Sequence, residues 1–111
     1  MTPRYTLCCA VLCFGFMTLA FAQDAVKAEP AHYKVETENT QIRVLRIHYG
    51  PHEKSVMHSH PASVAVYLSD GTIKFTDASG RTQDATAKKG QVSYTAAQTH
   101  NPENTSDTPS S

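Results

Sequence analysis

Three histidines in two short stretches are the residues of this chain whose type and spacing could support chemistry. His58 and His60 stand two residues apart, and His100 follows 40 residues after His60. On an extended strand, residues two apart project from the same face, so the first two imidazoles can point into one pocket. Neutral imidazole is the commonest side-chain ligand for zinc, copper, iron and nickel. The spacing predicts one divalent transition metal (Fe, Mn, Zn, Ni or Cu) held by His58, His60 and His100, if a sheet folds back to join the two stretches.

Other polar residues near these stretches are weaker candidates. His52 follows Gly50-Pro51, and we interpret it as an exposed turn residue rather than a fourth ligand. Glu103 is the one carboxylate near His100 that could orient or replace a ligand, but a turn led by proline disfavours this role. We expect Asn104 to fix its loop by hydrogen bonds from its side chain to the backbone. The sequence has no Ser-His-Asp order, phosphate loop or paired carboxylates, so no catalytic residue is assigned.

The first 22 residues have the pattern of a secretory signal peptide. Arg4 supplies a positive charge, residues 7–19 form an apolar run, and Ala20-Phe21-Ala22 is a small-x-small cleavage signal before Gln23. The run is short for a membrane span. We therefore expect a periplasmic or secreted protein that is cleaved before Gln23 and leaves the membrane, with 111 − 22 = 89 residues remaining.

Cysteine and charge restrict the function of those remaining residues. All three cysteines, Cys8, Cys9 and Cys13, lie in the expected signal peptide, so the mature chain has neither disulfides nor thiolate ligands. Of the 10 Lys and Arg residues, Arg4 is removed with that segment, which leaves nine against 10 Asp and Glu. This near-neutral balance excludes the basic footprint of a nucleic-acid-binding protein.

From residue 33 onward the pattern is that of short β-strands joined by turns. After a flexible lead-in over 23–32, strands are expected at 33–38, 41–49, 56–60, 63–68, 72–77, 82–87 and 91–95. Gly-containing turns separate many of them, and no segment shows a helical period. We expect an all-β barrel or sandwich over 33–104 and a disordered Ser/Thr/Pro-rich tail over 105–111.

The alternation also predicts which side chains face the interior. Val64, Val66 and Leu68 share one face of the strand at 63–68, and Ile73 and Phe75 share one face of the strand at 72–77. We expect these five apolar side chains to point inward and to line the pocket.

The first histidine stretch resembles motif 1 of the cupin superfamily, whose members are small double-sheet β-barrels. That motif has a glycine, His-x-His, a glutamate and a closing glycine. Here His58-Ser59-His60 matches the histidine pair, Gly71 matches the closing glycine, and Gly50 stands two residues upstream of the usual opening position. Counting back from Gly71 places Val64 at the glutamate position.

The second histidine stretch resembles cupin motif 2. Gly90 opens it, His100 matches its histidine and Asn104 its asparagine, while Thr95-Ala96-Ala97 replaces the usual Pro-x-Gly. The two motifs occur in order and at the right separation over roughly residues 42–109. The resemblance implies a small double-stranded β-helix, a cupin-like jelly-roll barrel, with a metal on the three histidines.

Two departures from the family pattern affect these expectations. Val64 cannot bind a cation, although some cupin dioxygenases use three histidines without the glutamate. Nothing apolar follows Asn104, where cupins continue with a strand that closes the barrel. We therefore expect the last C-terminal strand to be missing, or the sheet to be completed by N-terminal strands or by another subunit. An unpaired sheet edge in a domain this small predicts a homodimer or a poorly stable monomer.

Three hypotheses for function follow. The first is an exported barrel that binds a divalent metal, with a small-molecule ligand as a further expected partner. The second is a metal-dependent enzyme of the oxygenase type. The third is a degenerate or truncated barrel without catalysis. The predicted inward positions are all apolar, which favours binding over catalysis, and the sequence leaves the question of an enzyme open.

Overall fold

The structure, a computed structural model, describes residues 23–111, so the predicted signal peptide lies outside the described residues. One short helix precedes eight strands. In chain order these elements are α1 (Ala25–Ala28), β1 (Tyr33–Glu38), β2 (Arg43–Ile47), β3 (His58–His60), β4 (Ser63–Val66), β5 (Gly71–Asp77), β6 (Thr82–Ala87), β7 (Val92–Thr95) and β8 (Gln98–Asn104). The predicted all-β class is confirmed. No helix among residues 23–111 is long and apolar enough to cross a membrane.

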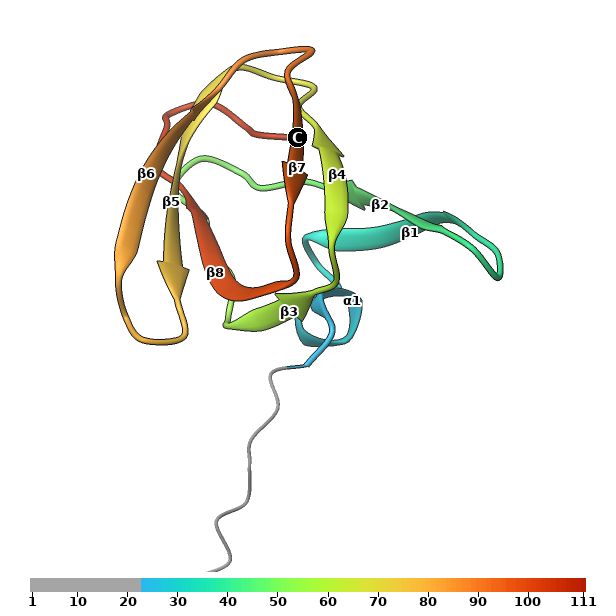
Figure 1. Cartoon of the computed structure of the whole chain (residues 1–111). Coiled ribbons are helices and arrows are strands. Elements are labelled where there is room, and N and C mark those ends of the chain that lie inside the picture. The colour runs from blue at the N-terminus through green and yellow to red at the C-terminus, as the bar shows by residue number, and fades with distance from the viewer. Residues whose placement is uncertain (1–22) are drawn as a thin grey trace, which may run out of the picture.

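The strands form one larger and two smaller antiparallel sheets. The larger sheet has the order β3-β8-β5-β6, and the pairs β1-β2 and β4-β7 form two-stranded sheets. In Figure 1, β4 and β7 lie across from β5, β6 and β8, while the β1-β2 hairpin projects away from these strands. The order β3-β8 brings the two histidine stretches side by side, although they are far apart in sequence.

Strand β8 was not expected, because the sequence places Pro102 in it. Proline has no backbone N–H and is found essentially at edges or bulges of sheets. Here β3 pairs with β8 only from His58↔His100 to His60↔Gln98, so the ladder on that side has ended before Pro102. On the same side the Pro102 carbonyl accepts a hydrogen bond from Ser55 N at 3.1 Å. The proline therefore interrupts no pair of the ladder.

The segment predicted as a flexible lead-in forms part of the core. Asp24 caps α1 by accepting a hydrogen bond from Val26 N at 3.2 Å. Ala25, Tyr33 and Tyr49 are buried together, and the two tyrosine hydroxyls are hydrogen-bonded at 3.0 Å. The lead-in thus positions Tyr33, which contacts the histidines described below.

The predicted inward face is correct on β5 and wrong on the β4 segment. Ile73 and Phe75 are half-buried, as expected for residues of an interior face. Val64, Val66 and Leu68 instead expose 66, 55 and 46% of their surface. The alternation correctly groups these three side chains, but no other described layer covers them.

Residues 105–111 make defined contacts instead of forming the expected disordered tail. The buried Asn104 side chain donates to the carbonyl of Thr108 at 2.8 Å and accepts from the hydroxyl of Ser106 at 2.6 Å. Ser110 pairs with Tyr49, and the Ser111 carbonyl accepts from Leu68 N at 2.8 Å. Backbone pairing and one buried amide hold this polar segment, and composition alone does not reveal such contacts.

Candidate metal centre

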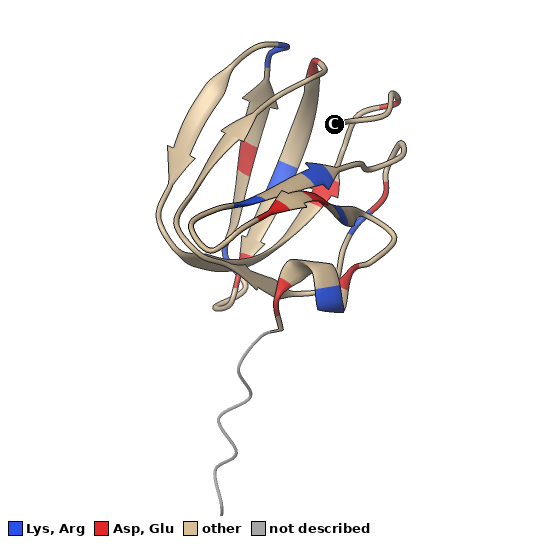
Figure 2. Ribbon diagram, turned by 90° about the vertical axis from the view of Figure 1, so that its right-hand side faces the viewer, with Lys and Arg blue, Asp and Glu red and all other residues tan. Residues whose placement is uncertain are grey.

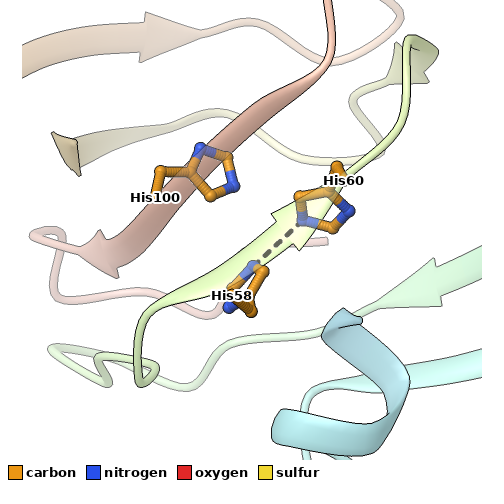
Figure 3. A group of neighbouring side chains, drawn as sticks. All are labelled: His58, His60 and His100. Carbon is orange, nitrogen blue, oxygen red and sulfur yellow. Dashed lines mark hydrogen bonds between the residues drawn. The ribbon is translucent and has the colours of Figure 1, made fainter. Parts of the chain in front are cut away.

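The pairing of β3 with β8 places the three predicted histidines on one face. His58 lies directly opposite His100, and His60 lies opposite Gln98. Directly opposed residues of an antiparallel pair project to the same side. Figure 3 shows the result, with His58 and His60 from β3 and His100 from β8 turned toward one another.

The three rings form a compact triangle. Their centroids are 4.7 Å apart for His58 and His60, 5.2 Å for His58 and His100, and 5.1 Å for His60 and His100. The interplanar angles lie between 76 and 88°, so the rings meet edge to face rather than stacked. One ring nitrogen from each histidine lies within 4.8 Å of the others. The three rings therefore share one small volume, in which one nitrogen of each is close to the others.

A second contact fixes the orientation of His58. Its Nδ1 lies 2.8 Å from the carbonyl oxygen of Val56, to which it donates a hydrogen bond. Because a neutral imidazole carries one N–H, this bond leaves Nε2 of His58 as an acceptor. Nε2 of His60 donates a hydrogen bond to it at 3.0 Å, a position that a metal ion would take over. Ligating histidines commonly donate their other ring N–H to a backbone carbonyl in this way.

His100 is buried, with both ring nitrogens unsatisfied within residues 23–111. It exposes only 6% of its surface, and both of its ring nitrogens are buried without a hydrogen-bond partner among the described residues. A buried polar group without a partner costs about 1–3 kcal/mol, and such groups are rare in native structures. On one side the Phe75 ring stacks on it at 5.3 Å and 24°. A metal ion would bind one of the two unpaired nitrogens.

Tyr33 covers the pair of histidines on β3. Its ring centroid lies 5.0 Å from that of His58 and 5.3 Å from that of His60. Tyr33 is 3% exposed, and burial, followed by the neighbouring Tyr49, raises the pKa of its hydroxyl. The sequence reasoning missed Tyr33, since a tyrosine at the start of a strand carries no signal of this contact.

Burial keeps all three imidazoles neutral at physiological pH. Burial first, and then the neighbouring histidines of the cluster, lower the pKa of His60 and His100 to about 4 each. Burial also lowers the pKa of His58, partly opposed by the Val56 carbonyl. Metal binding requires neutral imidazole, so at neutral pH no proton has to leave before an ion binds.

The donor set fits a transition metal ion. Nitrogen ligands about 2.0–2.1 Å from zinc lie roughly 2.8–3.4 Å from one another for bond angles between a right angle and the tetrahedral angle. The Nε2 atoms of His58 and His60, 3.0 Å apart, lie within this range. Three imidazoles with no thiolate and no carboxylate suit zinc, copper, iron and nickel.

The structure separates the weaker candidates from this cluster. His52 lies in a turn with a positive φ of 58°, and its Nε2 contacts a carboxylate oxygen of Asp107 at 2.7 Å. Glu103 is three residues from His100 on β8 and therefore projects from the opposite face of that strand. The expectations that His52 occupies a turn and that Asn104 fixes its loop agree with the structure, since Asn104 Nδ2 donates to the Gly50 carbonyl at 3.0 Å.

His32, for which the sequence predicts no role, contacts the histidine cluster indirectly, through Tyr49 and Tyr33. Its ring stacks on that of Tyr49 at 4.3 Å, and its two nitrogens contact Glu29 at 3.1 Å and Glu53 at 2.9 Å. Tyr49 in turn contacts Tyr33 edge to face. The His32 imidazole thereby links Glu29, Glu53 and Tyr49.

Comparison with known proteins supports the fold rather than a particular activity. No family model and no curated protein matches the chain. Among solved structures, a cupin domain from Bordetella pertussis Tohama I matches with a TM-score of 0.65 and 21% sequence identity, over 70% of this chain and 82% of that domain. The strand order, the two motifs and this match agree, and the chain therefore has the cupin fold.

Proposed function

We propose that this protein is an exported cupin-fold protein whose barrel binds one divalent transition metal ion through His58, His60 and His100. The single observation that carries the proposal is the cluster itself, in which three buried or half-buried imidazoles converge. A purely structural role does not explain this arrangement, because the buried nitrogens of His100, unpaired within the described part of the chain, lower the free energy of unfolding.

The surroundings of the cluster favour binding over catalysis. The aromatic neighbours of the histidines are Tyr33 and Phe75, whose rings contact them directly. A raised pKa keeps the Tyr33 hydroxyl protonated at neutral pH, so it cannot act there as a base. A bound metal would supply Lewis acidity and open coordination positions, and these would admit a small ligand. Oxygenase chemistry stays the alternative.

Export is part of the proposal and rests on the sequence. The positive residue, apolar run and Ala20-Phe21-Ala22 signal precede the first described residue, Gln23. The protein isolated from its producing cells should therefore begin at Gln23 by intact mass and fractionate with the periplasm or the medium. Retention of residues 1–22 in the cytoplasm would contradict this part.

Equilibrium dialysis against zinc tests the metal site. We expect about one ion per wild-type chain, and a loss of at least ~10–100-fold in affinity in His58→Ala and in His100→Ala, by comparison with the loss of an outer-shell partner. His48→Ala is the matched control, because His48 is exposed and its ring lies outside the cluster, with Nδ1 2.9 Å from the Ser111 hydroxyl. Equal affinity of wild type and His100→Ala would refute the proposed site.

A further inference from the structure

A glutamine shares the face of β3 and β8 that carries the three histidines. The two successive pairs His58↔His100 and His60↔Gln98 place four side chains on one side of this ladder. Three of them are the histidines of the metal centre, and the fourth is Gln98. The Cβ atoms of directly opposed residues lie about 4.5–5.5 Å apart, so the longer Gln98 side chain can reach any ion held by His60.

An independent contact confirms which residues share that face. Ser59 and Thr99 alternate with the histidines, and their hydroxyl oxygens lie 2.9 Å apart, so they meet on the opposite side of the ladder. Gln98 is therefore on the histidine side. It is half-buried, as is His60.

The position that should carry the family's carboxylate ligand does not provide one. Val64 has no oxygen, and 66% of its surface is exposed. An ion on three neutral imidazoles keeps its full charge and favours an oxygen ligand beside them. An amide carbonyl can serve, and a glutamine takes such a position in some copper sites.

We propose that Gln98 is the fourth protein ligand of the metal, through its side-chain carbonyl oxygen. This inference rests on the proposed metal site of the three histidines. It predicts a mixed set of three nitrogens and one neutral oxygen. It also predicts that a carboxylate at the same position binds the ion more tightly.

Cobalt(II) binding to wild type, Gln98→Leu and Gln98→Glu tests this assignment, with affinity and the visible absorption spectrum as readouts. We expect Gln98→Leu to lose ~10–100-fold in affinity, Gln98→Glu to gain affinity, and both to shift the spectrum. Gln83→Leu and Gln83→Glu are the controls, because Gln83 is exposed on β6 and should leave both readouts unchanged.

The outcomes distinguish this inference from the proposed function. Wild-type affinity and spectrum in both Gln98 variants would overturn the fourth ligand and leave the three-histidine site intact. Weaker binding of Gln98→Leu with an unchanged spectrum would also overturn it, since Gln98 would then act without touching the ion. Absence of cobalt binding by the wild type would overturn the proposed function and this inference together.

A second inference comes from an exposed apolar face, which we call the β4-β7 face. Val64 lies opposite Tyr94 and Val66 opposite Val92, so these four side chains share one side of the two-stranded sheet. Val92 and Tyr94 expose 64 and 72% of their surface, and Leu68 extends the same face. Together the five present on the order of 500 Å² of apolar surface, close to the largest patch of a typical monomer, about 300–600 Å².

The β1-β2 hairpin also exposes apolar side chains. It is also two-stranded, and Val35, Ile42 and Val44 expose 43, 58 and 42% of their surface. An isolated two-stranded hairpin is marginally stable in water. Figure 2 marks charged residues on this hairpin, while the β4 and β7 strands carry none.

We infer that a second copy of this chain covers the β4-β7 face. The β4-β7 face alone offers on the order of 500 Å² of apolar area per chain, a large part of the ~800 Å² per partner of a standard stable interface. In a symmetric dimer each copy presents this same face to its partner. The uncharged β4-β7 face supplies the apolar centre of this interface, and the charged residues of the hairpin supply its rim.

Sedimentation equilibrium tests the dimer on the full chain and on the chain that begins at Gln23. We expect a dimer in both, and a monomer for Val66→Lys, which should stay folded because Val66 is exposed within one chain. Thr72→Lys, an exposed position on β5, is the matched control and should remain dimeric.

Three results would overturn the dimer: a monomeric wild type, a Val66→Lys variant that is still dimeric, or association that requires residues 1–22. The last result would assign the β4-β7 face to the apolar N-terminal run instead of a second copy.

Discussion

Replacing His100 by phenylalanine should stabilise the metal-free protein and abolish its response to metal. The two buried nitrogens of His100 have no partner among the described residues. A phenylalanine ring has a similar shape and can keep the stack on Phe75, which lies 5.3 Å away. Removal of an unsatisfied buried group should raise the free energy of unfolding by about 1–3 kcal/mol. For a domain of this size, each kcal/mol corresponds to about 4–8 °C in Tm.

Metal should reverse this order of stability. Zinc at 100 times its dissociation constant adds about 2.7 kcal/mol to a protein with one site, and His100→Phe should gain almost none of it. The assay is thermal unfolding followed by circular dichroism, first with a chelator and then with zinc. His48→Phe, an exposed position, is the control and should respond to zinc as the wild type does. A metal-free His100→Phe protein less stable than the wild type, or one with a wild-type zinc shift, would refute the reasoning.

Three further predictions concern pH, the vacated ligand position and the C-terminal segment. Because the folded pKa of His60 and His100 is about 4 and the unfolded value is about 6.5, the unfolded chain binds more protons between these values. Metal-free stability should therefore be fully present above about pH 6.5 and fall toward pH 4 in urea titrations; a flat profile would contradict the buried cluster. Val64→Glu should leave zinc affinity unchanged, because Val64 is exposed; tighter binding would show that it faces the ion. Asn104→Ala should cost about 1–3 kcal/mol in urea unfolding, since its side chain no longer donates to the Gly50 and Thr108 carbonyls or accepts from Ser106, and a neutral effect would contradict the anchoring of residues 105–111.

The clustering of His58 and His60 could be predicted from sequence because it depends on strand alternation. His58 and His60 share a face in any extended segment, and the motif around His100 pointed to the same site. The register His58↔His100 could not be predicted, because which strands pair depends on contacts across 40 residues. Gln98 was overlooked for the same reason.

Burial was harder to predict than alternation. Val64 and Val66 were correctly placed on one face, but alternation does not tell whether another layer covers that face, and here none of the described residues does. Residues 105–111 show the opposite error. Their composition is typical of disorder, while the amide of Asn104 and the pairing of Ser110 with Tyr49 hold them.

The most direct test of the metal site is nitrogen-15 NMR of the imidazole rings during a zinc titration. We predict that the ligand nitrogens of His58, His60 and His100 shift together at one zinc per chain, with His58 bound through Nε2 because its Nδ1 donates to the Val56 carbonyl. The signals of the histidines outside the cluster should not move. Shifts confined to the exposed His48 and His52, or no shift at one equivalent, would contradict a metal centre on β3 and β8.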